Sequence, residues 1–315
     1  MSGETTGGEG TTDIEWPAPP ATVRESLLAW YDDGHRDFPW RDGADPWAIL
    51  VSEVMSQQTQ LDRIVEPWRA FVDRWPTPAA LAEADRSAVV AFWTDHSLGY
   101  NNRARYLHEA AATIEAEFDG SLPEDPDALQ ELSGVGPYTA TAVAAFAFDR
   151  PVAVVDTNVE RVLYRLIEGV RERDDPPYRA LVEALLDRDR PAAFNNAIME
   201  LGGVACSPTP ACDDADCPFR SHCHAYRTGD FTAPDVPTQP TFDGSRRQFR
   251  GRVLRALDPG DPRPVDALGH TIRVDYDPAG DPGRDWLEGL LADLEADGLI
   301  ERFTEEGREV VALQS

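Results

Sequence analysis

Two acidic residues stand in sequence contexts that suit proton transfer and charge stabilisation. Glu53 lies in the string 49–59, ILVSEVMSQQT, and helical spacing places it on the same face as Ile49 and Leu50. A carboxyl on an apolar face is desolvated, so its pKa rises and a proton stays available near neutral pH. Asp156 follows an apolar run and begins a helix, where an N-cap carboxylate is well fixed. One protonated and one ionised carboxyl together suit the cleavage of a glycosidic bond.

Each of these carboxyls also has an ordinary structural interpretation. A glutamate on an apolar helix face more often reaches out to solvent, and aspartate is common at helix starts. Gln57 and Gln58, which follow Glu53, suit hydrogen bonds to nucleic-acid bases or to water. The catalytic interpretation therefore requires that Glu53 and Asp156 meet across one pocket that is large enough for a purine.

The segment 132–140, LSGVGPYTA, combines the end of an amphipathic stretch, a Gly-x-Gly turn and the start of a helix. Gly134 and Gly136 allow a tight turn and the close approach of a partner, because neither carries a Cβ atom. The helix that follows presents N–H groups and the positive end of its dipole, which together bind anions. These properties fit a helix-hairpin-helix that grips a DNA phosphate, and an ordinary turn between helices has the same pattern.

All four cysteines fall in one short window, 206–223. They are Cys206, Cys212, Cys217 and Cys223, with gaps of five, four and five between them. In a cytosolic chain such a cluster indicates a metal site rather than disulfides. Thiolates suit zinc or an iron–sulfur cluster, and the spacing alone does not choose between them. His222 and His224 lie nearby as further candidate zinc ligands.

The chain of 315 residues contains no lysine, so all 29 of its Lys and Arg residues are arginine. A Schiff base needs a primary amine, and this chemistry is therefore excluded for the side chains. Asp and Glu number 57 and the formal net charge is −28, which is typical of halophilic proteins that stay soluble at high salt. An acidic mesophilic protein is the alternative. We expect the face that contacts substrate to be less acidic than the rest of the surface.

Composition excludes several classes of protein. Hydrophobic residues make up 42% of the chain, too many for a disordered protein. No stretch approaches the ~18 consecutive apolar residues of a membrane span. Residues 1–15 lack the basic region and the apolar core of a secretory signal. The expected location is the cytoplasm, with no membrane partner.

The elements that must position these residues are predicted to be helices from about Ala21 to Gly202. Apolar residues recur there at three- and four-residue spacing, and breakers such as Asp45-Pro46 separate the segments. The predicted helices are Thr22–Tyr31, Pro46–Gln60, Asp62–Trp75, Asn102–Phe118, Tyr138–Ala147, Thr157–Glu168, Tyr178–Leu186 and Ala192–Leu201. No alternating strand pattern occurs in this stretch, which indicates an all-α fold.

The chain changes character after the cysteines. A linker rich in Pro, Thr and Asp leads to predicted helices at 247–257 and 285–297, a third helix that starts at Asp266, and two short strands at 299–303 and 309–313. Helices followed by a hairpin resemble a winged helix, and a generic small α+β module reads the same. The predicted organisation is a flexible tail (1–18), a helical domain (19–205, hairpin 127–147), a cysteine loop (206–225), a linker (226–244) and a winged-helix-like domain (245–315).

Six segments within about residues 25–225 carry a family resemblance. They are FPWR (38–41), SEVMSQQTQ (52–60), LGYNNRARYLH (98–108), the hairpin, VDTNVERVL (155–163) and FNNAIMELG (194–202). Together they resemble the helix-hairpin-helix DNA glycosylases, and most closely adenine DNA glycosylases of the MutY type. The string around Glu53 is specific to that type, whereas the hairpin identifies only the superfamily. The resemblance implies two helical subdomains and a four-cysteine cluster loop.

The resemblance implies a role for each candidate residue. Glu53 protonates adenine and helps to activate water, and Asp156 stabilises the oxocarbenium ion. The adenine must leave the base stack for this chemistry. The implied DNA contacts are Gly134, Gly136, Gln57, Gln58, Tyr100 and Arg103, and the implied adenine pocket is Trp40, Arg41, Asn158 and Glu200. The implied cofactor is a [4Fe-4S] cluster held by the four cysteines, with zinc as the alternative.

Tyr138, the remaining catalytic candidate, stands where relatives of the endonuclease III type carry a lysine nucleophile. The resemblance therefore implies a monofunctional enzyme that leaves an abasic site. The expected partner is double-stranded DNA with adenine opposite guanine or 8-oxoguanine, bound by a monomer. The C-terminal segment is too short for the domain with which bacterial relatives recognise 8-oxoguanine. The alternatives are a G·T or G·U mismatch glycosylase of the same superfamily and a non-catalytic metal-cluster regulator that binds DNA.

Overall fold

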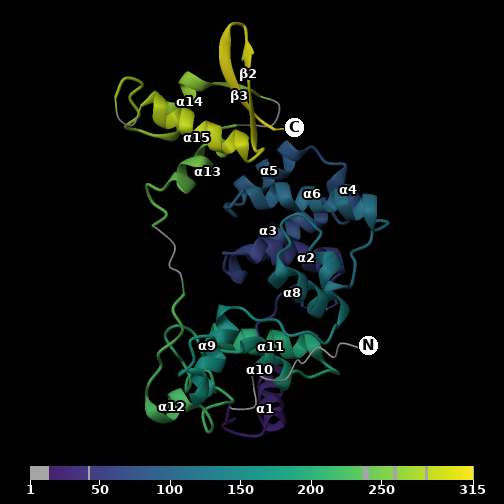
Figure 1. The fold of residues 1–315 in the computed structure, drawn as a ribbon. Coiled ribbons are helices and arrows are strands. Elements are labelled where there is room, and N and C mark those ends of the chain that lie inside the picture. The colour runs from purple at the N-terminus through teal and green to yellow at the C-terminus, as the bar shows by residue number, and fades with distance from the viewer. Residues whose placement is uncertain (1–13, 42, 237–240, 258–260, 281–282, 315) are drawn as a thin grey trace, which may run out of the picture. The chain divides into compact units, whose positions relative to one another are not determined.

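The computed structural model describes residues 14–41, 43–236, 241–257, 261–280 and 283–314, and these are mainly helical with one small sheet (Figure 1). The chain forms two compact units that interleave along the sequence. Unit 1 comprises residues 1–49, 124–127 and 136–237, and unit 2 comprises residues 50–123, 128–135 and 238–315. Most of the predicted tail, residues 1–13, and part of the predicted linker, residues 237–240, lie outside the described residues.

Unit 1 is built around helices α9 (Thr157–Leu166) and α11 (Pro191–Val204), which pack against each other. Helix α1 (Pro20–Asp33), from near the start of the chain, also packs on α11. Leu163 and Ile198 are fully buried in the apolar core that these helices share. The other helices that lie in unit 1 are α8 (Pro137–Phe148), η1 (Glu168–Val170), α10 (Tyr178–Leu185) and α12 (His224–Thr228).

Unit 2 contains the C-terminal part of α2 (Pro46–Ser56) and a helical group in which α4 and α5 pack against α6. The bounds of this group are α3 (Leu61–Arg74), α4 (Pro78–Ala82), α5 (Arg86–Asp95) and α6 (Asn102–Glu117). Phe71 of α3 meets Phe92 and Trp93 of α5 edge to face, with ring centroids 5.4 and 6.4 Å apart. This aromatic contact fixes α3 against α5.

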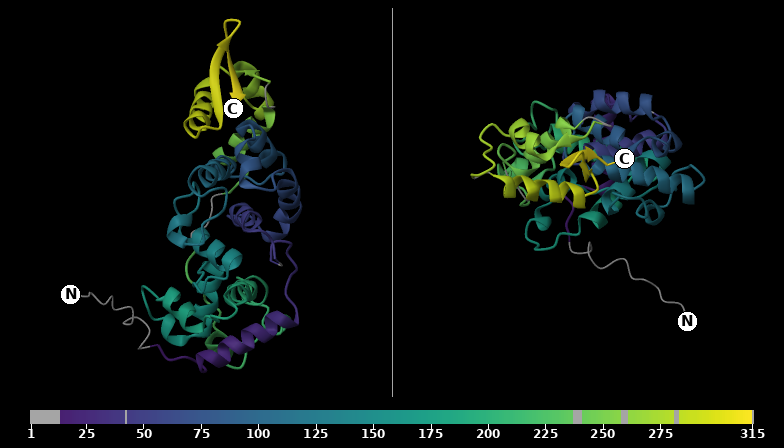
Figure 2. Two further views of the ribbon diagram at one scale, coloured as in Figure 1. Left: turned by 90° about the vertical axis from the view of Figure 1, so that its right-hand side faces the viewer. Right: turned by 90° about the horizontal axis from the view of Figure 1, so that it is seen from above.

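A small α+β module ends unit 2, as the sequence predicts. It consists of α13 (Arg246–Ala256), β1 (Arg263–Pro264), α14 (Val265–Ile272), α15 (Arg284–Ala296), β2 (Ile300–Glu305) and β3 (Arg308–Leu313). The antiparallel sheet has the order β1-β3-β2, and the hairpin of β2 and β3 lies beside α15 (Figure 2). Glu306 and Gly307 both have positive φ, which matches the twist of a two-residue hairpin turn. Helix α13 also packs on α5.

The all-α prediction for the first part of the chain is confirmed, with local differences. Helix α2 ends at Ser56 rather than Gln60, because Gln58 has a φ of 61° that a helix cannot continue. Helices α4 and α5 were not predicted, since α4 is short and α5 is apolar on several sides. Helix α7 (Pro126–Leu129) is likewise short. Within the described residues, no helix combines the length and the apolar character that crossing a bilayer requires.

Candidate functional site

Asp156 caps helix α9 through its side chain. Its Oδ1 accepts hydrogen bonds from the backbone N–H groups of Asn158 (2.9 Å) and Val159 (2.8 Å), and its Oδ2 accepts one from Nδ2 of Asn158 (2.7 Å). The helix-cap interpretation is therefore confirmed. These three donors and the positive end of the helix dipole stabilise the ionised carboxylate and fix its orientation.

Asn158 connects the Asp156 carboxylate to the neighbouring helix. Nη2 of Arg161 donates both to Oδ1 of Asn158 (2.7 Å) and to the carbonyl of Gly202 on α11 (2.8 Å). A Cβ atom at Gly202 would lie 2.7 Å from Cβ of Asn158, so α9 and α11 approach this closely only with glycine there. The carboxylate is thus fixed by contacts that extend across two helices.

Glu200 is buried on α11 and forms ion pairs with two arginines that follow α1. Its Oε1 accepts a hydrogen bond from Nε of Arg36 at 2.7 Å, and its Oε2 accepts one from Nη2 of Arg41 at 2.8 Å. Burial raises the pKa of Glu200, but the hydrogen bonds from Arg36 and Arg41 outweigh burial and hold the pKa below its usual range. Glu200 is therefore an ionised anchor for these arginines.

Trp40 and Arg41 pack on the same aromatic ring. The Trp40 ring stacks on Phe38 with a centroid distance of 5.0 Å and an interplanar angle of 7°. The Arg41 guanidinium lies 4.8 Å from the centre of the Phe38 ring. Unit 1 thus brings together three of the residues predicted for the adenine pocket, namely Trp40, Arg41 and Glu200.

Glu53 lies near the end of α2, in unit 2, and 9% of the residue is exposed. Leu50 and Val54 on the same helix are buried with it. Glu53 therefore lies in a segment of α2 that is buried among apolar side chains. Asp156 belongs to unit 1, so the expectation that the two carboxyls share one pocket stays a prediction.

Gln57, Gln58 and Tyr100 line a pocket of unit 2 with a volume of about 480 Å³. Gln58 and Tyr100 both adopt left-handed backbone conformations, with φ angles of 61° and 47°. Such conformations cost free energy in residues other than glycine and concentrate at functional sites. Oη of Tyr100 donates to Oε1 of Gln58 at 3.2 Å, which joins the segment after α2 to the segment before α6.

Arg103 is buried behind this pocket, and its guanidinium holds the two segments in place. Nη1 donates to the carbonyls of Val54, Met55 and Gln57, and Nη2 donates to those of Leu98 and Gly99. Desolvation lowers the pKa of Arg103 to about 10, which leaves it charged at neutral pH. The predicted DNA contact at Arg103 stays a prediction, and these bonds give it a positioning role.

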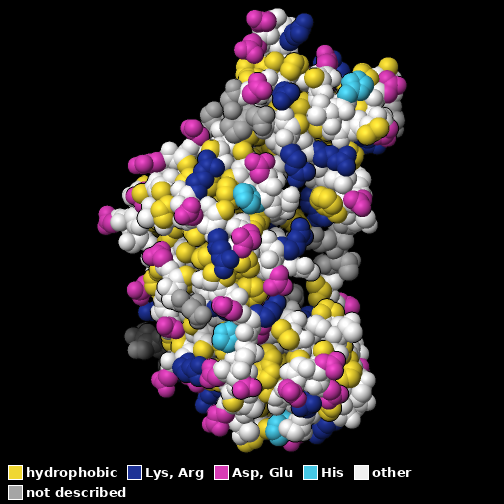
Figure 3. All heavy atoms as spheres, turned by 180° about the vertical axis from the view of Figure 1, so that it is seen from behind, with side chains coloured by type: hydrophobic (Ala, Val, Ile, Leu, Met, Phe, Trp, Pro, Cys, Tyr) yellow, Lys and Arg dark blue, Asp and Glu magenta, His cyan; other side chains and the backbone are white. Residues whose placement is uncertain are grey.

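The lining of this pocket is rich in arginine. Acidic and arginine side chains are interspersed over the face that Figure 3 shows. Among the described residues that line the pocket of unit 2, three are arginine and none is aspartate or glutamate. The local lack of carboxylates fits the expectation of a less acidic face for substrate.

The two glycines of the Gly-x-Gly turn have different structural roles. Gly134 has a φ of 77°, and a Cβ atom there would lie 2.7 Å from Cβ of Tyr106, so the fold requires glycine. Gly136 has an ordinary φ of −84°, and no described atom lies within 4 Å of where its Cβ would stand. Gly136 is also the N-cap of α8, so the space at its Cβ position lies at the positive end of this helix.

Tyr138 lies in the first turn of α8. It is half-buried and packs against the small apolar group Ala142, Ala145 and Val154. Tyr138 therefore has a packing role, and its predicted place in catalysis stays a prediction.

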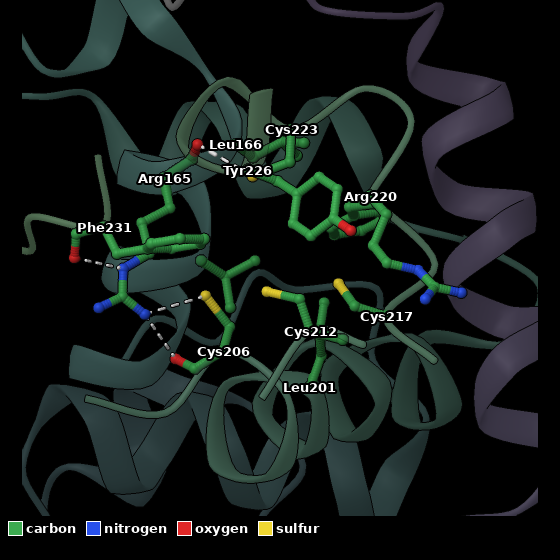
Figure 4. A pocket seen from close by; sticks show the side chains of 12 residues that line it. Arg165, Leu166, Leu201, Cys206, Cys212, Cys217, Arg220, Cys223, Tyr226 and Phe231 are labelled. Carbon is green, nitrogen blue, oxygen red and sulfur yellow. Dashed lines mark hydrogen bonds between the residues drawn. The ribbon is translucent and has the colours of Figure 1, made fainter. Parts of the chain in front are cut away.

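The four cysteines line one pocket in unit 1, between the end of α11 and the start of α12. Figure 4 shows the sulfur atoms of Cys206, Cys212 and Cys217 pointing toward its centre. Burial raises the pKa of Cys217 to about 12 and also raises the pKa values of Cys212 and Cys223. As free thiols they are therefore protonated, and a bound cation is what would favour the thiolates.

Arg165 of α9 anchors the start of the cysteine loop. It is only 2% exposed, and its Nη1 donates to the carbonyl of Ser207 (2.8 Å) and to Sγ of Cys206 (3.5 Å). Its backbone carbonyl accepts a hydrogen bond from Sγ of Cys223 at 3.2 Å. One residue thus contacts both ends of the cysteine set.

The thiols that line the pocket are soft ligands. Within the described part of the chain, no group of three or more His, Cys, Asp or Glu residues is arranged to hold one metal ion. Zinc brings its ligands to about 2.3 Å from one centre, so a preformed zinc site would meet this condition. His224 instead pairs with Glu168, with Nδ1 3.4 Å from Oε2.

Several arginines at these sites were not predicted from the sequence. Arg36 anchors Glu200, Arg165 anchors the cysteine loop, and Arg247 of α13 donates to Oη of Tyr100 at 2.5 Å. Each contact joins residues that lie far apart in the chain. The absence of lysine was the available signal, since arginine alone then has to supply every cationic contact.

Comparisons with known proteins agree on one family. Residues 51–186 match the HhH-GPD superfamily of base excision DNA repair proteins. An adenine DNA glycosylase of Mycolicibacterium smegmatis is 40% identical over 91% of this chain and 94% of its own length. The human adenine DNA glycosylase is 40% identical over 64% of this chain and 39% of its own length.

A solved structure also shares the fold. The structure of a thermostable thymine-DNA glycosylase matches with a TM-score of 0.61 and 26% identity, over 67% of this chain and 97% of the other. The mycobacterial match extends further, because the unmatched part of this chain is smaller than residues 245–315. The C-terminal module is thus at least partly shared with that relative.

Proposed function

This chain belongs to the HhH-GPD superfamily of base excision DNA repair proteins and, within it, to the adenine DNA glycosylases. We propose that it hydrolyses the N-glycosidic bond of adenine opposite guanine or 8-oxoguanine. The observation that carries the chemistry is the Asp156 carboxylate, which three N–H donors fix at the start of α9. A fixed anion is what a developing sugar cation needs.

Glu53 acts as the acid in the proposed reaction. It donates its proton to a ring nitrogen of adenine, and the glycosidic bond breaks with its electron pair passing to the base. Asp156 stabilises the positive charge that develops on the sugar. Water then adds to C1′, its proton passes to the Glu53 carboxylate, and the products are adenine and an abasic site.

The remaining site residues bind and orient in this proposal. Trp40, Arg41, Asn158 and Glu200 line the pocket for the extruded adenine. Glu200 does so through Arg41, because both of its oxygens already accept hydrogen bonds from arginines. Gly136 at the N-terminus of α8 holds a phosphate, for which its surroundings leave room.

We propose that the enzyme is monofunctional and binds DNA as a monomer. Strand cleavage through a Schiff base needs an amine, and Tyr138 offers a phenol at the position where relatives have lysine. Borohydride added during turnover is expected to trap no covalent protein–DNA adduct. A trapped adduct in good yield contradicts this part of the proposal.

We propose that the four cysteines hold a [4Fe-4S] cluster. Their convergence on one pocket and their soft thiol chemistry fit such a group, and zinc is the alternative. The cluster would be a structural centre that orders residues 206–223. Purification without oxygen, with quantification of iron, sulfide and zinc, tests this; one zinc and no iron would overturn it.

Base release from four duplexes tests the function. Duplexes with A·G, A·8-oxoguanine, T·G and U·G are incubated with the protein at molar KCl, the condition that its acidic composition predicts to be suitable. Release of adenine from the first two supports the proposal. Release of thymine or uracil alone favours a mismatch glycosylase, the second candidate, which the likeness to a thymine-DNA glycosylase supports. Binding without any release favours a regulator.

A further inference from the structure

Asn195 of α11 is a fully buried amide whose partners include the chain segment just before Asp156. Its Oδ1 accepts a hydrogen bond from the backbone N–H of Val154 at 3.0 Å. Its Nδ2 donates to the carbonyls of Val152 at 3.0 Å and of Pro191 at 2.9 Å. Both ends of the amide thus have partners, and a rotation that exchanged nitrogen and oxygen would lose all three bonds.

The segment that Asn195 holds has no regular structure of its own. Helix α8 ends at Phe148 and α9 begins at Thr157, and residues 149–156 between them belong to neither a helix nor a strand. Backbone groups in such a segment need partners from elsewhere in the fold. Asn195 bonds the groups on either side of Ala153, which is itself buried. The chain is therefore fixed two residues before Asp156.

Helix α11 holds the chain after Asp156 as well. Gly202 follows Asn195 by seven residues, which is about two helical turns, so both lie on the same face of α11. The carbonyl of Gly202 accepts a hydrogen bond from Arg161, and Gly202 also packs closely against Asn158. One helix face thus fixes the backbone on both sides of the carboxylate.

The same helix carries Glu200, the buried anchor of Arg36 and Arg41 in the proposed adenine pocket. The position of the base pocket relative to Asp156 is thus set along a single helix. Such placement matters because an error of about 1 Å at a reacting centre can cost roughly 10²-fold in rate. An anion that stabilises the sugar has to stand in register with the pocket that holds the base.

We propose that Asn195 is a positioning residue, which sets the place of the Asp156 carboxylate by holding residues 152–154 on α11. The inference rests on the proposed function for the role of Asp156. Asn195 is buried and acts through the backbone rather than by touching DNA. Its effect therefore falls on the stabilisation of a sugar cation and not on the binding of a neutral sugar.

Two DNA ligands that cannot be cleaved separate positioning from stability. Both are duplexes with guanine opposite an abasic sugar analogue. One analogue is a pyrrolidine whose protonated ring nitrogen replaces C1′, and the other is a neutral tetrahydrofuran. The ratio of their dissociation constants measures how strongly the site prefers a cation at C1′. Asn195→Ala is expected to reduce this preference by roughly tenfold and to leave binding of the neutral analogue nearly unchanged.

Asn195→Ser is a second variant that keeps a small polar side chain. A serine hydroxyl bonds the carbonyl four residues earlier, that of Pro191, but is too short to hold both Val152 and Val154. It should show the same loss of preference. Leu185→Ala is the matched control, since Leu185 is fully buried in the core of unit 1 and its apolar side chain holds no backbone group. It should lower the unfolding temperature and leave the ratio unchanged.

Asp156→Asn tests the route of the effect. It should abolish the preference for the cation, and adding Asn195→Ala to it should change the ratio no further. An unchanged ratio in both Asn195 variants, or an equal loss on the two ligands, overturns the proposal and makes Asn195 a folding residue only.

The wild-type protein separates this result from a failure of the proposed function. Equal wild-type binding of the two analogues overturns the role of Asp156 and the inference with it. Wild-type release of adenine from the A·G duplex, together with a preference for the cation, supports the function, so an unchanged ratio in the variants then counts against Asn195 alone.

Discussion

The two units each carry one candidate catalytic carboxyl, and they hold it in different ways. Asp156 in unit 1 is a helix cap that accepts hydrogen bonds from three N–H donors. Glu53 in unit 2 lies within a helix, on a face where Leu50 and Val54 are buried. A helix N-terminus stabilises a negative charge, whereas an apolar helix face does not. The two carboxyls are therefore held differently, Asp156 by hydrogen bonds at the start of a helix and Glu53 among buried apolar side chains.

Each unit also contains a buried arginine whose guanidinium donates hydrogen bonds to several backbone carbonyls. Arg165 does this for the cysteine loop of unit 1, and Arg103 does it for the segments that carry Gln58 and Tyr100 in unit 2. In unit 2 a further arginine, Arg247, contacts the pocket from the C-terminal module.

The largest expected effect comes from exchanging each carboxyl for its amide. Glu53→Gln removes the proposed acid and should lower single-turnover base release by about 10²–10⁴-fold. Asp156→Asn removes the charge and should lower it by about 10²–10³-fold. Asparagine is also a good helix cap, so the Asp156→Asn protein should unfold at nearly the wild-type temperature. Unchanged base release in both variants would contradict the proposed catalytic roles of Glu53 and Asp156.

Replacing the shared scaffold arginines by lysine should have the next largest effect. Arg103→Lys and Arg165→Lys keep a cation but lose the planar fork, and each should lower the free energy of unfolding by about 2–4 kcal/mol. Chemical denaturation measures this change. Arg69→Lys is the control, because Arg69 pairs with Glu66 at an exposed site and should change stability by less than about 0.5 kcal/mol. A similar change in all three variants contradicts the proposed scaffold role.

The two glycines of the Gly-x-Gly turn are expected to differ in their effects on stability and on DNA binding. Gly134→Ala forces a positive φ and a clash with Tyr106, and should lower the free energy of unfolding by about 1–3 kcal/mol. Gly136→Ala meets open space and should leave stability nearly unchanged while weakening DNA binding. Equal destabilisation by the two changes would mean that Gly136 is also a folding residue.

The smallest effect concerns acid sensitivity in unit 1. The pKa of Glu200 is lowered in the folded protein, so the stability it contributes is present above its unfolded pKa and is lost as the pH falls through the lower folded pKa. Wild-type denaturation midpoints should therefore fall as the pH drops below about 4.5, the ordinary value. Glu200→Gln should be less stable at neutral pH and should lose less on acidification. An identical slope for both proteins contradicts this assignment.

Local features of the site were predictable from the sequence, and long-range ones were not. Spacing and residue type within short windows predict three of these features. They are the helix cap at Asp156, the turn between β2 and β3 at Glu306-Gly307, and the convergence of the cysteines. The early end of α2 was missed because Gln58, unlike glycine, gives no sign of a positive φ.

The arginine partners were missed for a different reason. Arg36 meets Glu200 and Arg247 meets Tyr100 only after distant helices have packed, so no local pattern contains these pairs. The placement of Glu53 on a buried helix face could be predicted from its apolar neighbours. The expected meeting of Glu53 and Asp156 stays a prediction, because it depends on segments that belong to different units and spacing does not encode their packing.

The interleaving of the two units has a consequence for synthesis. Helix α1 packs on α10 and α11, so its apolar face stays uncovered until the ribosome has made the chain as far as Val204. Unit 2 in turn includes residues 238–315 and cannot be complete before these have been made. Neither unit is a contiguous stretch of chain, and a nascent chain therefore exposes apolar surface for an extended time. Such exposure makes the incomplete chain more prone to aggregation than a chain whose domains are contiguous.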